Sequence, residues 1–241
     1  MILQVDLDKH MNNETHIVKS YEEELQHLHD TLIQMGSLTE SQLSDSLEAV
    51  IKVDKESTDK IIKSDEKVNK FRSKIDTQIM NLLVKRAPMA IDLRSTISAL
   101  KISQDLERIG DLAKSNAKKV EPLPLDLPDS LVQSLKRLGD LVQKQLKDVI
   151  DSYVNKSLDK SLAVWKGDEK VDDLTHLAMN NVMDFLSKDK KNLAFSTHLI
   201  FVTKNLERAG DHITNIAESV YYLIKGEYLK GHRPKGKDTS V

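Results

Sequence analysis

Apolar residues recur at helical spacing through most of the first half of the chain, and this period is typical of long amphipathic helices. The pattern predicts one helix that starts near Asn12–Thr15 and breaks at Val53–Asp54. A second helix should stop before Pro88, because the residue that precedes a proline avoids the α region. A third should run from Met89 to Val120.

The second half repeats this plan after a proline-rich segment. Helices are predicted over residues 129–155, 158–187 and 192–225. We therefore expect an all-α fold of six long helices, arranged as two tandem homologous three-helix bundles. The expected divisions are a flexible N-terminal arm (1–15), the first repeat (16–120), a Pro-rich linker (121–130), the second repeat (131–227) and a flexible C-terminal tail (228–241).

A direct comparison of the two halves indicates that they arose by duplication. The sequence MGSLTESQLSD at 35–45 aligns with LGDLVQKQLKD at 138–148, and the Asp-Glu-Lys-Val of residues 65–68 recurs 103 positions later. LERIGD at 106–111 aligns with LERAGD at 206–211, at an offset of 100. The change of three falls in the hairpin between the second and third helices, where length changes are tolerated.

Composition supports the helical prediction and excludes several classes of protein. The chain has eight glycines, five prolines and 4% aromatic residues, too few for a typical β-sandwich or barrel. A net charge of −2 argues against nucleic-acid binding, and the absence of cysteine excludes disulfides and thiolate metal sites. Since no apolar run approaches about 20 residues and no apolar signal segment is present, we expect a cytoplasmic protein without direct membrane insertion.

The candidate chemistry begins with a duplicated pair of acids spaced four residues apart. These are Glu107 with Asp111, and Glu207 with Asp211. This spacing places both carboxylates of a pair on one helix face, one turn apart. Relative to the apolar stripe of their own helix, both pairs should point away from the core of their bundle.

A second pattern of the same spacing lies on the preceding helix of each half. It comprises Asp65 and Asn69 in the first half, and Asp168 and Asp172 in the second. Residues equidistant from the turn of an antiparallel helical hairpin lie at one height. In each half the midpoint between the two patterns falls on a predicted turn, at Pro88 and within residues 187–192. The two patterns should therefore lie level on adjacent helices.

Carboxylates that lie level on adjacent helices repel one another unless a cation lies between them, and hard oxygen ligands suit Mg²⁺, Ca²⁺, Mn²⁺ or iron. The alternative is a solvated acidic face compensated by Arg108, Arg208 and nearby lysines. Asn69 gives the first site one charge fewer, so we expect it to bind metal more weakly. The candidate metal ligands are Glu107, Asp111, Asp168, Asp172, Glu207, Asp211, Asp65 and Asn69.

No candidate nucleophile or general base accompanies these acids, and the eight histidines are scattered. The chain has no H-E-x-x-H motif, glycine-rich phosphate loop or G-x-S-x-G motif. We therefore expect a protein that is not an enzyme. A carboxylate-bridged metal-dependent enzyme and a purely structural helical scaffold are the alternatives.

Several motifs occur together in this chain. They are the duplicated L-E-R-[IA]-G-D, Met35-Gly36, the repeated Asp-Glu-Lys-Val, Arg86-x-Pro88 followed by Leu93-Arg94, and Asn215-Ile216-Ala217-Glu218. In order and spacing these motifs resemble those of the PhoU family. The resemblance covers about residues 17–227 and implies two packed three-helix bundles. It further implies a cytoplasmic negative regulator of the phosphate-starvation response, which links the ATPase subunit of the Pst phosphate ABC transporter to a PhoR-type sensor histidine kinase.

The resemblance also bears on the metal and on assembly. It implies a multinuclear centre of iron, with Zn, Mn, Mg or Ca as alternatives, bound through the [ED]-x-x-x-D acids, and a homodimer. Asn69 stands where the family usually has Asp, and Ser115 where its first repeat usually has Asn. Both departures should weaken the first site. Since PhoU-like domains recur elsewhere, an accessory subunit of a different phosphate transporter is a further alternative.

Overall fold

The computed structural model describes the backbone of residues 2–188, 193–231 and 233–236, and side chains from Lys19 onward. Over these residues the chain forms seven helices and no strand. The helices are α1 (Ile2–Lys52), α2 (Thr58–Arg86), α3 (Ala90–Ala117), α4 (Asp129–Asn155), α5 (Leu158–Lys166), α6 (Asp168–Lys188) and α7 (Leu193–Lys225). The predicted all-α fold of two three-helix bundles is confirmed.

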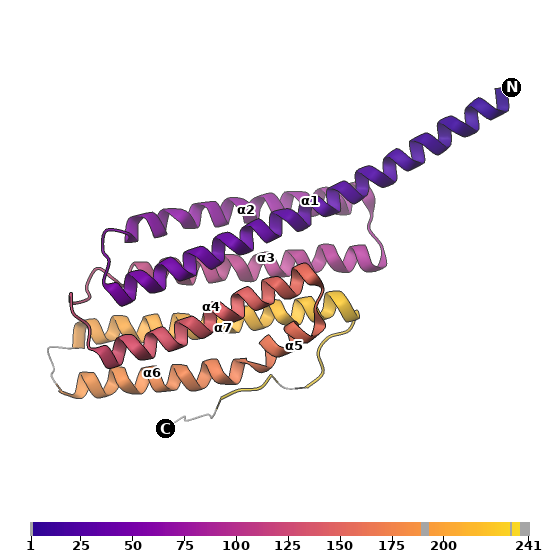
Figure 1. Cartoon of the computed structure of the whole chain (residues 1–241). Coiled ribbons are helices and arrows are strands. Elements are labelled where there is room, and N and C mark those ends of the chain that lie inside the picture. The colour runs from indigo at the N-terminus through magenta and orange to yellow at the C-terminus, as the bar shows by residue number, and fades with distance from the viewer. Residues whose placement is uncertain (1, 189–192, 232, 237–241) are drawn as a thin grey trace.

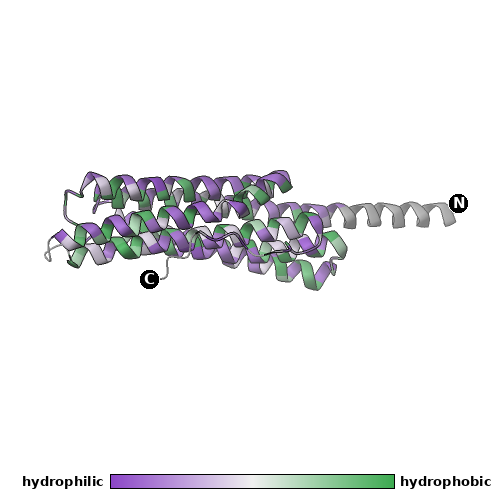
Figure 2. Cartoon of the chain, turned by 90° about the horizontal axis from the view of Figure 1, so that it is seen from below, coloured by the Kyte–Doolittle hydropathy of each residue, from purple (hydrophilic) through white to green (hydrophobic). Residues whose placement is uncertain are grey.

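Each half is an antiparallel bundle with its apolar stripes turned inward. Helices α1, α2 and α3 pack together in the first half, and α4, α6 and α7 in the second, with α5 against α4 and α7 (Figure 1). Figure 2 shows apolar and polar residues alternating in stripes along the helices. The buried apolar side chains of both halves form one contiguous cluster, so the two bundles share a core.

The halves pack through repeat-equivalent elements, α1 on α4 and α3 on α7. A Cβ atom on Gly36 of α1 would lie 3.0 Å from Cδ1 of Ile150, and one on Gly139 of α4 would lie 2.1 Å from Cδ2 of Leu47. Gly139 is the repeat equivalent of Gly36, and Ile150 is that of Leu47. The contact is therefore reciprocal, as it would be between two subunits related by a twofold axis.

A polar seam between α3 and α7 has the same symmetry. Asn205 donates to Ser115 Oγ at 3.1 Å, and the equivalent residues Asn215 and Asp105 pair at 3.3 Å. His212 Nδ1 lies 2.9 Å from the same Asp105 oxygen. Ser115 thus lies in the interface between the halves, where its hydroxyl accepts a hydrogen bond from α7. That Ser115 weakens the first acidic site stays a prediction.

The helix boundaries differ from the sequence prediction in two places. The single helix expected over residues 158–187 is divided into α5 and α6 at Gly167, where a Cβ atom would lie 2.6 Å from Nε2 of Gln145. Helix α1 begins at Ile2, well before Asn12, and runs past the ends of α2 and α3 in Figure 1. The start of this helix was predicted from the apolar period, which the polar N-terminal residues lack. These residues nevertheless continue the helix.

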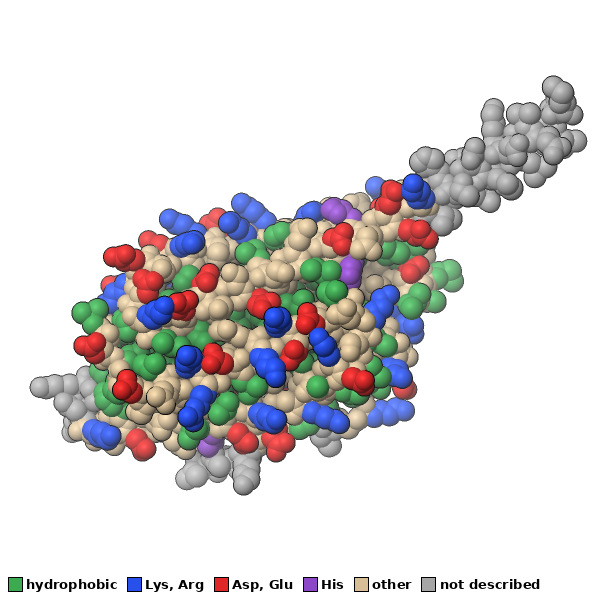
Figure 3. Space-filling view, in the orientation of Figure 1, with side chains coloured by type: hydrophobic (Ala, Val, Ile, Leu, Met, Phe, Trp, Pro, Cys, Tyr) green, Lys and Arg blue, Asp and Glu red, His purple; other side chains and the backbone are tan. Residues whose placement is uncertain are grey.

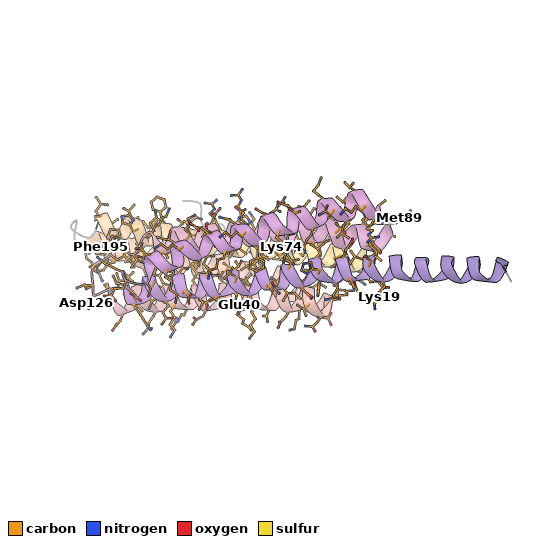
Figure 4. The ribbon with its side chains drawn as sticks, turned by 90° about the horizontal axis from the view of Figure 1, so that it is seen from above. Lys19, Glu40, Lys74, Met89, Asp126 and Phe195 are labelled. Atoms are coloured by element: carbon orange, nitrogen blue, oxygen red, sulfur yellow. The ribbon has the colours of Figure 1, made fainter. Side chains whose placement is uncertain are left out.

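The connections lie at opposite ends of the molecule. Figure 4 shows Met89, between α2 and α3, at one end, and Asp126, which precedes α4, at the other. Residues 189–192 of the second predicted turn lie outside the described residues, as do residue 232 and residues 237–241 of the tail. Helices α2 and α6 lie on opposite outer sides of the molecule, separated by the other long helices (Figure 1). Each outer helix carries one of the D-x-x-x-[DN] patterns.

The reciprocal glycine contact predicts unequal effects of two equivalent substitutions. Gly139→Ala should lower the free energy of unfolding by about 1–2 kcal/mol, because its methyl group collides with the buried Leu47 side chain. Gly36→Ala should cost less than about 0.5 kcal/mol or stabilise the protein, because only the end of Ile150 must move and alanine favours the helix. Urea denaturation of both variants measures the difference, and equal effects would contradict the close packing at Gly139.

Candidate functional site

The first acidic cluster lies between α2 and α3 and contains its own cation. Helix α2 supplies Asp65 and Asn69, and α3 supplies Glu107 and Asp111. Lys114 Nζ lies 2.7 Å from Asp65 Oδ2, and Asn69 donates to the same oxygen at 3.2 Å. The bond to Asp65 raises the pKa of Lys114. The contact between Asp65 and α3 confirms that the hairpin brings the two patterns level.

Asp65 is buried rather than exposed, with 1% of its surface accessible. Its Oδ1 has no hydrogen-bond partner among the described residues, and neither has the side-chain amide of the buried Gln42. A Cβ atom on Gly110 would lie 3.1 Å from Gln42 Oε1 and 3.7 Å from Asp65 Oδ1. Gly110 therefore lets α3 approach the buried polar atoms of Gln42 and Asp65 closely.

Two arginines also lie near the outward acids of this cluster. Arg108 lies 3.4 Å from Asp111 and 3.7 Å from Glu107, and the charge of Glu107 acts to raise the pKa of Arg72 against the effect of burial. Arg72 itself is ion-paired with Asp76, so the cations in direct contact with the acids of the first cluster are Lys114 and Arg108 of α3.

The second acidic cluster lies between α6 and α7 and takes its cation from the C-terminal segment. The guanidinium of Arg233 binds Asp168 with both arms, Nε to Oδ2 at 2.6 Å and Nη2 to Oδ1 at 2.5 Å. The same Nη2 lies 2.8 Å from Asp211 Oδ1. The Gly236 N–H donates to Asp172 at 2.9 Å. Because Asp168 and Asp211 share one nitrogen, their oxygens lie within two hydrogen-bond lengths of each other.

The four acids of the second cluster act on one another. Burial is the main cause that raises the pKa of Asp211 above its usual value, and the charges of Asp168, Glu207 and Asp172 raise it further against the opposing effect of Arg233. Asp168 itself is only 2% exposed and also accepts a 3.3 Å hydrogen bond from Thr214 Oγ1. Ion pairing of Glu207 with Lys204 adds a cation at the rim.

Comparison of repeat-equivalent positions explains why the two clusters are neutralised differently. Lys114 of the first half corresponds to Thr214 in the second, and Arg72 corresponds to Thr175. The second cluster therefore has one acid more, through Asp172 in place of Asn69, and lacks both of these cations. A buried carboxylate such as Asp168 needs a compensating charge, and here the charge comes from Arg233.

The structure bears out the predicted outward direction of the E-x-x-x-D pairs. The side chains of Glu107, Asp111, Glu207 and Asp211 all retain surface exposure, from 23% to 50%. The first acids of the other pattern, Asp65 and Asp168, are buried instead, because hairpin register fixes the height of a residue but not the side to which it points.

Metal binding itself stays a prediction. Over the described residues, no group of three or more His, Asp or Glu side chains has an arrangement ready for a metal ion. The second cluster fits a hard cation by the chemistry of its donors, since Asp168 and Asp211 already share one positive group and the charges of Glu207 and Asp172 act on Asp211. The first cluster fits it less well, because Lys114 occupies Asp65 and Asn69 brings no charge.

Several residues of the clusters were not found from the sequence. Lys114, Arg72, Thr214 and Thr175 could have been found by extending the repeat alignment to the neighbours of the acids. Arg233 gave no signal, since a basic segment after the last helix is ordinarily a solvated tail. Gln42 and its equivalent Gln145 are buried amides without partners among the described residues, and they lie on the helices next to the acids.

The fold and the clusters define a class of protein, a helical-bundle domain present in two copies with an acidic site on the outer side of each. A family model described as the PhoU domain matches residues 32–120 and again residues 135–220. The chain therefore belongs to the PhoU family.

Named relatives match over nearly the whole chain. The phosphate-specific transport system accessory protein PhoU homolog of Caulobacter vibrioides is 41% identical over 221 residues, 91% of this chain and 96% of that protein. The homolog of Rhizobium meliloti is 36% identical over 227 residues, 94% of this chain and 96% of that protein. Since this is a family of accessory proteins, the prediction that the chain is not an enzyme is confirmed.

Solved structures agree with these matches. The crystal structure of PhoU from Pseudomonas aeruginosa superposes with a TM-score of 0.80 at 30% identity, covering 86% of this chain and all of that one. The phosphate transport system regulatory protein PhoU from Streptococcus pneumoniae gives a TM-score of 0.80 at 29% identity, covering 87% of this chain and 99% of that one. None of the helices over the described residues has the length and hydropathy that a bilayer crossing requires.

Removal of the internal cation from the first cluster should destabilise the protein. Lys114→Met keeps the aliphatic stem but leaves the buried Asp65 carboxylate without its counter-charge, at an expected cost of about 3 kcal/mol. The double variant with Asp65→Asn should recover most of this loss, because no charge then remains buried. Lys74→Met on the exposed side of α2, labelled in Figure 4, is the control. Urea denaturation of the unmodified protein and the three variants measures the free energy of unfolding. An equal loss in Lys74→Met would contradict the role of Lys114 as the counter-charge of Asp65.

Removal of one outward acid from the second cluster should not destabilise the metal-free protein. Because the folded-state pKa of Asp211 is raised, its ionisation opposes folding above that pKa, and the effect disappears as the pH falls and the carboxyl protonates. At pH 7 and with a chelator present, the free energy of unfolding of Asp211→Asn should therefore be unchanged or raised by about 0.5 kcal/mol. Asp168→Asn should lose stability, because Arg233 and Thr214 lose a buried partner. A large loss in Asp211→Asn would contradict the pKa direction.

Proposed function

We propose that this protein is an accessory regulator of a phosphate-specific transport system that holds the phosphate-starvation response off when phosphate is plentiful. The observation that carries the proposal is the match of both repeats to the PhoU domain, together with relatives named for this system at 36–41% identity over most of the chain. The protein would act in the cytoplasm as a homodimer. It would bind the ATPase subunit of a Pst transporter and a PhoR-type sensor histidine kinase.

The architecture supports an adaptor with two partners. The two halves have the same fold, and α2 and α6 face outward on opposite sides of the molecule (Figure 1). The face in Figure 3 mixes positive and negative side chains, so net charge alone does not select a partner. Large exposed apolar side chains near the α2–α3 hairpin are Met80, Val84, Met89, Ile91 and Leu93. Apolar side chains of this kind form the cores of protein interfaces, and we assign a partner contact to this end of the first bundle.

The second cluster is the stronger metal site in this proposal. Asp168, Asp172, Glu207 and Asp211 would hold a hard cation such as iron, Mn²⁺ or Mg²⁺, and the first cluster would bind more weakly. A bound cation would cross-link α6 to α7 and turn an acidic surface into a neutral or positive one. A partner that reads this surface would then respond to the metal.

Neutral substitutions at the second cluster test the proposal. Glu207→Gln with Asp211→Asn should leave starvation genes expressed in rich phosphate, because the substitutions remove metal ligands without removing core volume. Glu107→Gln with Asp111→Asn should act in the same direction but more weakly, since Lys114 and Asn69 already reduce the first site. A starvation-promoter reporter in a strain that carries each variant measures the effect.

Immunoblots and thermal unfolding of the purified proteins control for protein level and folding. Normal repression by both double variants at normal protein level would show that the carboxylates are a solvated face. In that case the regulatory role would depend on another surface.

A further inference from the structure

The C-terminal segment folds back onto the second cluster. In Figure 1 the described part of the chain after α7 passes beneath α5 and reaches α6. This brings Arg233 to Asp168 and Asp211, and Gly236 to Asp172. A planar guanidinium bound with both arms to one carboxylate is among the strongest hydrogen-bonded ion pairs in proteins.

Gly236 shows that the segment fits closely against α6. A Cβ atom at this position would lie 2.5 Å from Cβ of Asp172, 3.1 Å from Oδ1 of Asp173 and 3.2 Å from the carbonyl oxygen of Glu169. No side chain can be accommodated there while the backbone N–H keeps its hydrogen bond to Asp172. The docked segment thus has a steric requirement that is independent of its charge.

The segment engages the oxygens that a metal ion would need. It takes both oxygens of Asp168, one of Asp211 and one of Asp172. A divalent cation that bridges these carboxylates would use the same oxygens and the same space, and it would repel the guanidinium. Arginine and metal therefore cannot occupy the cluster together.

We propose that the Arg233–Gly236 segment is a built-in occupant of the second cluster that competes with metal, so that metal binding releases the C-terminal segment. The inference rests on the metal site of the proposed function. It accounts for the difference between the halves, because Lys114 of the adjacent helix neutralises the buried acid of the first cluster permanently, whereas Thr214 at the equivalent position leaves the second to a cation that can leave. Metal cannot bind while the segment is docked. The apparent metal affinity is therefore the intrinsic affinity multiplied by the fraction of molecules in which the segment is undocked.

Two variants should undock the segment for different reasons, and a third variant is the matched control. Arg233→Gln removes the charge, Gly236→Ala removes the fit without changing charge, and Lys235→Gln removes one charge from the same segment at an exposed position. Titration of the full-length proteins with Mn²⁺, followed by electron paramagnetic resonance, measures binding. We expect Arg233→Gln and Gly236→Ala to bind Mn²⁺ at least tenfold more tightly than the unmodified protein and Lys235→Gln. Asp168→Asn should lose the tight site.

Hydrogen exchange reports the segment directly. Without metal, the amide of Gly236 should be protected, and saturating Mn²⁺, Arg233→Gln or Gly236→Ala should each remove this protection. Equal Mn²⁺ affinity in all variants, or a Gly236 amide that Mn²⁺ protects further, would overturn the competition. Absence of Mn²⁺ binding from every variant would overturn both the competition and the metal site. The regulatory role would be unaffected by that result, because the reporter strain tests it separately.

Discussion

A carboxylate buried between two helices must be neutralised, and this requirement arises once in each bundle. Asp65 and Asp168 occupy equivalent positions, and each is almost without solvent exposure. Burial of a charge without a partner is costly, so each acid needs a cation at hydrogen-bond distance. The first half supplies Lys114 from the adjacent helix, and the second receives Arg233 from beyond the end of α7.

The two halves meet as two subunits of a symmetric dimer would. Gly36 and Gly139 allow α1 and α4 to cross closely. The polar pairs between α3 and α7 join repeat-equivalent positions in both directions. Reciprocal contacts of this kind fix both distance and register along the long helices. They hold the outer helices α2 and α6 on opposite sides of the molecule.

Much of this organisation could be predicted from the sequence, because it depends on local period and on duplication. The helical period predicted the helices, Pro88 predicted the first hairpin, and the midpoint of each hairpin predicted the level of the acids. The division at Gly167 escaped the period, since one glycine bends a helix without changing its apolar stripe. Burial of Asp65 and Asp168 depends on which side of α2 and α6 faces the neighbour, and Arg233 reaches its cluster through tertiary contacts that no periodicity encodes.

Joining the repeats in one chain has an evolutionary consequence. In an assembly of identical subunits, every substitution is copied into each subunit, so both acidic sites would have to carry the same cation. Gene duplication followed by fusion removes this constraint, because Lys114 and Thr214 are encoded separately. One copy could then become a fixed structural element while its twin remained free to acquire an exchangeable ligand. The interface between the halves remains pseudo-symmetric, while the cations at the two buried acids differ.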